Sequence, residues 1–142
     1  MAKEIKKGKS AVVFALKGEL GAGKTTFVQG FFKGLGLKKR APSPTFIIMR
    51  RHSLLHARGA HPGMSGAAQH SAFKNIFHVD AYRLKRDADF DVLGFGDIFA
   101  DPHNIILIEW AERVRRLLPR GAVWLTFHYG KRENERRIII KK

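Results

Sequence analysis

The sequence has no cysteine, few acidic residues and no long hydrophobic run, and each shortage excludes something. Without cysteine, the chain can form neither a disulfide nor a cysteine-ligated zinc site. Its apolar runs fall well short of the about 18 residues of a membrane-spanning helix, so we expect no contact with a membrane. These shortages fit a cytoplasmic protein, and the cytoplasm is the location that we expect.

The scarcity of acidic residues leaves the chain strongly basic. Lys and Arg number 27 against 12 Asp and Glu, which gives a formal net charge of +15. Charge of this sign attracts polyanions such as RNA. A solubilising surface explains it equally well, because no aromatic-rich RNA-binding signature accompanies it. Many of the cations crowd the C-terminal end: Arg113, Arg115, Arg116, Arg120, Lys131, Arg132, Arg136, Arg137, Lys141 and Lys142.

The clearest positive signal is a glycine-rich loop, residues 18–25, with the spacing G-x-x-x-x-G-K-T. In such a loop backbone N–H groups can surround a phosphate, Lys24 can reach the β- and γ-phosphates, and the Thr25 hydroxyl can ligate Mg²⁺. The flanks agree, because residues 11–16 resemble a buried strand and the apolar residues at 27–35 have helical spacing. We therefore predict a bound nucleotide and Mg²⁺, with contacts from Gly21, Ala22, Gly23, Lys24, Thr25 and Thr26.

Further along the chain, apolar runs alternate with turn-forming residues. Two prolines are expected to hold residues 38–46 extended. A glycine- and histidine-rich stretch, residues 52–71, is typical of a long, flexible surface loop. The other predicted elements are strands at 46–49, 75–79 and 105–108, a short helix within 87–99 broken at Gly94 and Gly96, a helix at 111–118, and a terminal hairpin of strands 122–129 and 136–140.

These elements predict one α/β domain over residues 1–142. With 44% hydrophobic residues the chain can bury a real core. We expect a P-loop NTPase-like three-layer fold, with a central mostly parallel sheet and antiparallel edge strands. Ligands of such sheets bind at the carboxyl ends of the strands. The glycine-rich loop, Asp80 and Glu109 all follow predicted strands, so they can share one site.

The roles of the residues that end the later strands stay open on sequence pattern alone. Glu109 follows four aliphatic residues and can hold the Mg²⁺ shell or orient the attacking water, but it can also simply cap the next helix. Asp80 can be a second acid near Mg²⁺ or a turn-forming residue. Trp110 can stack on a base or ribose, seal the site, or pack. His78 shares a strand face with Asp80 and fits a core position or a supporting role behind a ligand.

Four short segments together resemble one protein family. Residues 18–27, 43–46, 78–84 and 107–110 have the order and spacing of the TsaE family, also called YjeE. These are bacterial ATPases of tRNA threonylcarbamoyladenosine biosynthesis. The resemblance covers about residues 8–140, apart from 52–71. The combination of four motifs is far more specific than the glycine-rich loop alone.

The resemblance implies an activity and a set of roles. The protein would act with TsaD and TsaB, which transfer a threonylcarbamoyl group to the adenosine beside the tRNA anticodon, and it would hydrolyse ATP, weakly when alone, to support their repeated turnover. ATP and Mg²⁺ would be its cofactors, with Lys24 on the phosphates. Thr25 and Glu109 would serve Mg²⁺, and Asp80 and Glu109 would be the catalytic acids. The resemblance also implies that Thr45 senses the γ-phosphate and that Trp110 lies near the nucleotide.

Two features of the chain depart from the family pattern. Family members usually carry a strand and most of a helix before the point where this chain begins, and the segment 3–9 resembles the tail of that helix. The segment 52–71 is foreign to the pattern. An alternative function is that of a basic RNA- or complex-binding module that uses the nucleotide only as a conformational switch. A small-molecule kinase is disfavoured because no lid or acceptor-binding insertion is evident. Direct contact with tRNA is left open.

Overall fold

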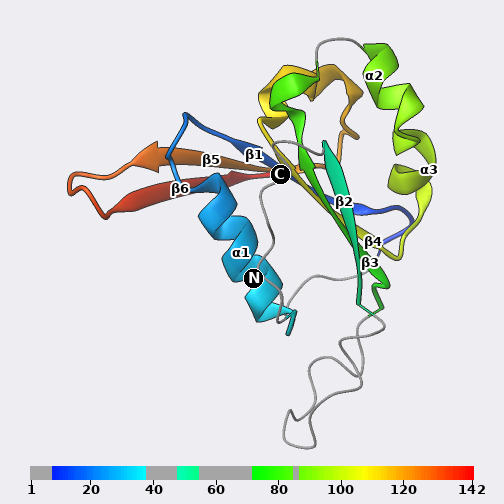
Figure 1. Cartoon of the computed structure of the whole chain (residues 1–142), viewed down its shortest axis with the longest axis horizontal. Helices are drawn as coiled ribbons and strands as arrows, with labels where there is room; N and C mark the ends of the chain where they lie inside the picture. Colours follow the sequence, from blue (N-terminus) through cyan, green and yellow to red (C-terminus); the bar gives the residue numbers. More distant parts are fainter. Residues whose placement is uncertain (1–7, 38–47, 55–71, 85–86) are drawn as a thin grey trace, which may run out of the picture.

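A six-stranded mixed sheet forms the centre of the protein in the computed structural model, which describes residues 8–37, 48–54, 72–84 and 87–142 (Figure 1). The strand order is β2-β3-β4-β1-β5-β6. Neighbours from β3 to β5 run parallel, whereas β2 and β6 run antiparallel at the two edges. This confirms the predicted sheet. The strands are β1 (Val12–Lys17), β2 (Met49–Ser53), β3 (Asn75–Asp80), β4 (Asn104–Glu109), β5 (Val123–Tyr129) and β6 (Arg136–Lys141).

Helices cover both faces of the sheet and complete three layers. One face carries α1 (Lys24–Gly34), and Figure 1 shows α2 and α3 on the opposite side of the sheet. The elements of that second layer are the 3-10 helix η3 (Ala81–Arg83), α2 (Asp87–Val92), α3 (Phe95–Ala100) and the 3-10 helix η4 (Ala111–Leu117). Among the described residues, no helix has the length and apolarity to cross a membrane.

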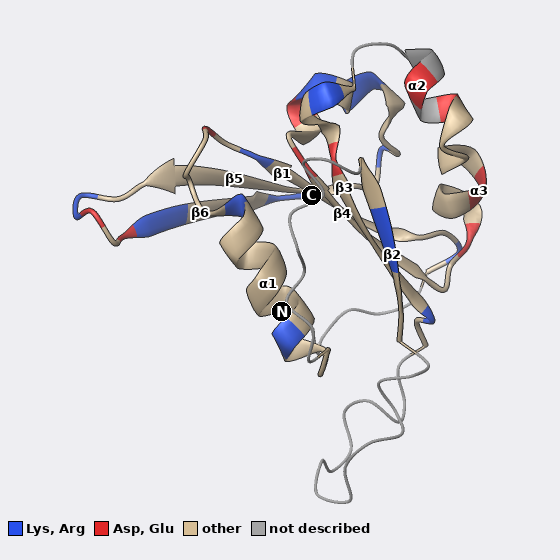
Figure 2. Ribbon diagram, viewed as in Figure 1, with Lys and Arg blue, Asp and Glu red and all other residues tan. Residues whose placement is uncertain are grey.

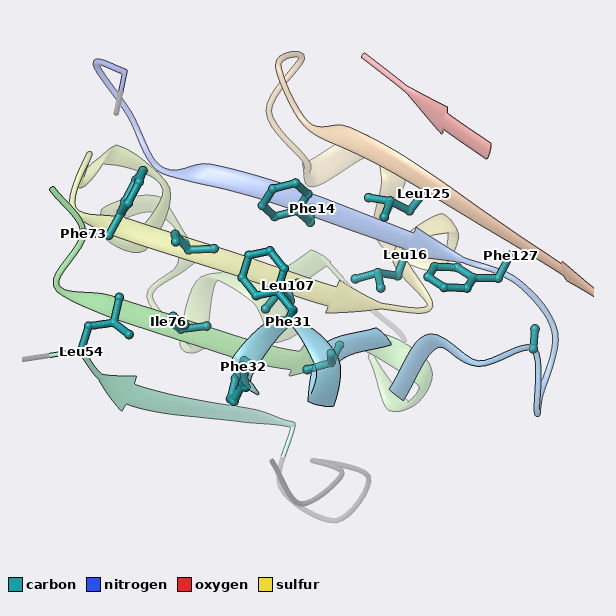
Figure 3. Close-up of a cluster of buried hydrophobic side chains, with 13 residues drawn as sticks. Phe14, Leu16, Phe31, Phe32, Leu54, Phe73, Ile76, Leu107, Leu125 and Phe127 are labelled. Carbon is teal, nitrogen blue, oxygen red and sulfur yellow. The ribbon is translucent and has the colours of Figure 1, made fainter. Parts of the chain in front are cut away.

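Two buried clusters follow from the alternation of side chains along the strands. In β1, Phe14 and Leu16 face α1, whereas Val13 and Ala15 face the other helical layer. Figure 3 shows the α1 cluster, in which Phe31 contacts Phe14 edge to face with ring centroids 5.4 Å apart. Strands buried on both faces read as continuous apolar runs, which is why they could be predicted.

Some element boundaries differ from the sequence prediction. The strand expected at 46–49 begins at Met49 and ends at Ser53, so the loop expected from residue 52 begins after that strand. Pairing with β3 along its whole length holds this polar segment extended. The helix expected at 111–118 is a 3-10 helix. Gly94, with φ 70°, separates α2 from α3, but Gly96 lies inside α3 and does not break it.

Charge is distributed unevenly over these elements. Figure 2 shows Lys and Arg along β6 and η4, and acidic residues on α2 and α3. Within η4 the first turn carries the acidic Glu112, and the last turn carries the basic Arg115 and Arg116. The proline-containing segment 43–46 and residues 55–71 lie outside the described residues, as does most of the segment 3–9.

Candidate functional site

The glycine-rich loop joins β1 to α1 in a conformation that requires glycine. Gly21 and Gly23 have φ of 75° and 98°, in the left-handed region that side chains disfavour. Gly18 has φ 151°, and a Cβ at this position would lie 2.8 Å from the backbone oxygen of Phe127. The loop therefore packs directly against β5, and its backbone shape depends on the absence of side chains.

Lys24 begins α1 and is held in a pocket of its own loop. Its side chain is buried, and Nζ donates to the carbonyl oxygens of Gly18 at 2.6 Å and Glu19 at 2.8 Å. The ammonium also lies 3.8 Å from the centroid of the Trp110 ring. Burial lowers the pKa of Lys24, and the carboxylates of Glu109, Glu112 and Asp80 oppose that shift.

The two predicted acids come together because β3 and β4 are parallel neighbours. Asp80 and Glu109 end these strands as register partners, and both are buried. Glu109 Oε2 accepts a hydrogen bond from Thr25 Oγ1 at 2.8 Å. Asp80 Oδ1 accepts from the backbone N–H of Tyr82 at 2.9 Å, which holds the start of η3. The structure thus brings three distant parts of the chain to one place.

A cavity of about 470 Å³ lies above these groups. Lys24, Thr25, Asp80 and Glu109 line it, with Trp110 at one wall. Trp110 has φ 57°, which is unusual for a residue with a side chain, and its ring packs on Tyr82 at 5.1 Å between centroids. The Trp110 ring thus lies between Tyr82 and the Lys24 ammonium, and it contacts both. The prediction that it contacts the nucleotide stays a prediction.

Comparison with known proteins decides the family. A family model described as "Threonylcarbamoyl adenosine biosynthesis protein TsaE" matches residues 1–139. The chain belongs to the TsaE family.

Individual relatives agree with this assignment. A Haemophilus influenzae protein named tRNA threonylcarbamoyladenosine biosynthesis protein TsaE is 30% identical, over 84% of this chain and 64% of its own length. A Bacillus subtilis protein of the same name is 33% identical, over 76% of this chain and 56% of its own. The crystal structure of YdiB from Bacillus subtilis is 28% identical in sequence and superposes with a TM-score of 0.60. The match covers 92% of this chain and 68% of the YdiB chain. The chain thus spans less than two thirds of the two sequence relatives' length.

Other residues with predicted roles take different places around this TsaE-family loop. Gly21, Gly23 and Thr26 line the cavity, whereas the side chain of Ala22 is buried in the core, so Ala22 can offer a ligand only its backbone. Thr45 lies outside the described residues, and its role as a γ-phosphate sensor stays a prediction.

The terminal hairpin supplies contacts that sequence reasoning missed. Tyr129 Oη donates to the carbonyl oxygen of Leu20, and Arg136 Nη2 donates to that of Gly21 at 3.4 Å. The Arg136 guanidinium also lies over the Tyr129 ring, 5.0 Å from its centroid. Residues of both the glycine-rich loop and the hairpin, among them Gly21 and Arg136, line a second cavity of about 370 Å³. No signal in the sequence indicated these contacts, because a hairpin pattern does not say what the hairpin packs on.

The oxygen atoms at this site suit magnesium. The Thr25 hydroxyl and the Glu109 carboxylate are hard oxygen donors, and Mg²⁺ is commonly held by one or two protein groups together with water and phosphate oxygens. Within the described ranges, no group of three or more His, Cys, Asp or Glu side chains could hold a metal ion unaided. An ion beside Thr25 would therefore draw further oxygens from a ligand such as a nucleotide phosphate.

Proposed function

We propose that this chain binds ATP with Mg²⁺ in the cavity beside Lys24 and hydrolyses it in support of threonylcarbamoyladenosine modification of tRNA, together with TsaB and TsaD. The convergence of Lys24, Thr25, Asp80 and Glu109 on one cavity carries the proposal. The names of the Haemophilus and Bacillus relatives support the modification pathway.

The chain's own groups suit the binding of ATP phosphates and the transfer of a phosphoryl group to water. The loop carbonyls fix the Lys24 ammonium, so its charge is in place for a phosphate bound in the loop. Thr25 and Glu109 would hold Mg²⁺, which neutralises charge on the phosphate oxygens when bound. Asp80 lies beside Glu109 at the same sheet edge, where an acid can orient a water molecule.

One observation favours the alternative of a binding module that uses the nucleotide as a switch. The terminal hairpin of β5 and β6, called here the cationic hairpin because β6 carries Arg136, Arg137 and Lys141, contacts the glycine-rich loop through Arg136. A polyanion bound to the hairpin could therefore influence a nucleotide bound in the loop, and the reverse. In that case the protein would bind ATP and change its affinity for RNA or for a protein complex, with negligible turnover.

Hydrolysis assays with matched variants test the two functions. We expect Mg²⁺-dependent ATP hydrolysis that rises when TsaB and TsaD are added and stops with a chelator. Lys24→Ala should lose nucleotide binding, whereas Lys33→Ala, which removes an exposed lysine from the far end of α1, should not. Glu109→Gln should still bind ATP but hydrolyse it on the order of 100-fold more slowly, a size typical for loss of one active-site electrostatic contact.

Two results would contradict the catalytic assignment. Equal hydrolysis by wild type and Glu109→Gln, with and without the partners, would remove Glu109 from the chemistry. ATP binding without any turnover in either condition would favour the switch.

A further inference from the structure

His78 is a fully buried polar side chain in the middle of an apolar strand. It lies on β3 between Phe77 and Val79, and its exposed fraction is 0%. Burying an imidazole is unfavourable unless its polar atoms find partners. An apolar side chain would suit the packing at this position better, so the histidine needs another reason.

The hydrogen bond that the imidazole makes with Glu109 supplies that reason. His78 Nε2 lies 2.8 Å from Glu109 Oε1, on the neighbouring strand β4. The register partner of His78 is Leu107, so Glu109 is two residues further along the same face of β4. Because a carboxylate oxygen accepts, Nε2 carries the hydrogen. Nδ1 is buried and has no hydrogen-bond partner among the residues that the structure describes, which favours the tautomer in which Nδ1 has no hydrogen to leave unpaired.

The Glu109 carboxylate is consequently held at both oxygens. His78 donates to Oε1 and Thr25 donates to Oε2 at 2.8 Å. A carboxylate with the Thr25 contact alone could rotate about its own axis and exchange its oxygens. The second hydrogen bond, from His78, fixes which oxygen faces the Thr25 hydroxyl at the start of α1.

We propose that His78 is a positioning residue for Glu109: its Nε2–H holds Oε1, so that Oε2 stays beside the Thr25 hydroxyl in the orientation used for Mg²⁺. This rests on the proposed function of Glu109. His78 touches neither nucleotide nor metal in this role. Residues that orient a metal-binding carboxylate typically change metal affinity or activity by about 10- to 100-fold when replaced.

Two substitutions at position 78 separate positioning from packing. His78→Gln keeps an N–H donor at a similar reach, whereas His78→Leu fills the space without a donor. The readouts are calorimetric binding of Mg²⁺–ATP, the Mg²⁺ concentration at half-maximal hydrolysis, kcat with KM for ATP, and thermal unfolding. We expect His78→Leu to unfold at a temperature no lower than wild type, yet to need about 10-fold more Mg²⁺ and to lose kcat by about 10- to 100-fold. His78→Gln should keep most of the wild-type Mg²⁺ affinity and most of the wild-type kcat.

His52 provides the matched control. Its ring packs against Phe32 at 4.9 Å, on the same helix that His78 contacts at 6.1 Å, but it lies on β2 and has no contact with Glu109. His52→Leu should leave Mg²⁺ dependence and kcat unchanged. Should His78→Leu not fold, His78→Asn replaces it, because the shorter amide stays polar but cannot reach Glu109.

The outcomes are distinguishable from failure of the proposed function. An active wild type with unchanged Mg²⁺ dependence in the donor-less variant overturns the role of His78 alone, as does equal impairment of the Gln and donor-less variants. A wild type that shows no Mg²⁺-dependent ATP binding overturns the proposed function and this inference together.

Discussion

Gly18 and Gly30 have different surroundings, and alanine substitutions at the two positions should have opposite effects on stability. Gly18 is packed against the backbone of β5, where an added Cβ would lie 2.8 Å from Phe127 O and 3.0 Å from Phe127 Cβ. Because Phe127 is buried and its strand is paired on both sides, neither atom can move aside easily. We expect Gly18→Ala to lower the free energy of unfolding by about 1–3 kcal/mol, measured by urea denaturation, and to weaken ATP binding.

Gly30 is the control for that substitution. It lies inside α1, and apart from the helix's own backbone no atom of the described residues comes within 4 Å of an added Cβ. Alanine has higher helix propensity than glycine, so Gly30→Ala should raise the free energy of unfolding by about 0.5–1 kcal/mol. A loss of stability at both positions would mean that the close approach at Gly18 does not determine its effect.

At the scale of single residues, the sequence predicted that Asp80 and Glu109 end strands and can lie together, but it did not predict the residue that contacts Glu109. Asp80 and Glu109 could be found because each ends an apolar strand, a pattern visible along one segment. The contact of His78 with Glu109 depends on which strands are neighbours and in which register. Local patterns do not contain that information, so the strand position of His78 could be predicted but its partner could not.

At the scale of elements, the β5–β6 hairpin holds the glycine-rich loop from outside. Tyr129 and Arg136 are register partners near the hairpin turn, and each donates to a loop carbonyl. We expect Arg136→Ala to weaken ATP binding by about 2- to 10-fold, the effect of losing roughly one hydrogen bond, with little change in thermal unfolding. Calorimetry of ATP binding measures the change.

The next residue of the strand offers the matched control. Arg137→Ala removes the same charge from the same strand, at a position paired with His128 instead of Tyr129. Equal weakening by both substitutions would show that general positive charge, and not the contact with the loop, determines the affinity.

Element boundaries could be predicted where a strand has a clear apolar pattern, and not in β2, whose residues are mostly polar. The buried β3 and β4 were predicted to within a residue at each end. In β2, Arg50, Arg51 and His52 are polar, and the strand exists because its backbone pairs with β3. Tertiary pairing of this kind overrides local propensity.

At the scale of the whole molecule, the net charge of +15 makes polyanion binding the expected long-range property. If the cationic hairpin contacts tRNA, each phosphate neutralised releases counterions, so affinity should fall at least about 10-fold between roughly 50 and 200 mM salt. Filter binding or fluorescence anisotropy with tRNA measures this slope, and heparin tests whether charge alone suffices. A flat salt response would contradict an electrostatic contact.

The three-layer architecture could be predicted as a class, because alternating strands and helices have few ways to bury their apolar faces. The sheet order could not be predicted in the same way. The placement of β1 between β4 and β5 depends on crossovers between distant segments.

The outer edge of β6 has a consequence for handling the protein. Ile138, Ile139 and Ile140 are 40%, 38% and 53% exposed on a strand that ends the described sheet. Such an edge can pair with the same edge of a second molecule and start aggregation. Arg136, Arg137 and Lys141 on that strand would bring like charges together in such a pair, so repulsion keeps the molecules apart in dilute buffer. Concentrated salt screens this repulsion, and purification at high ionic strength therefore removes the protection against self-association.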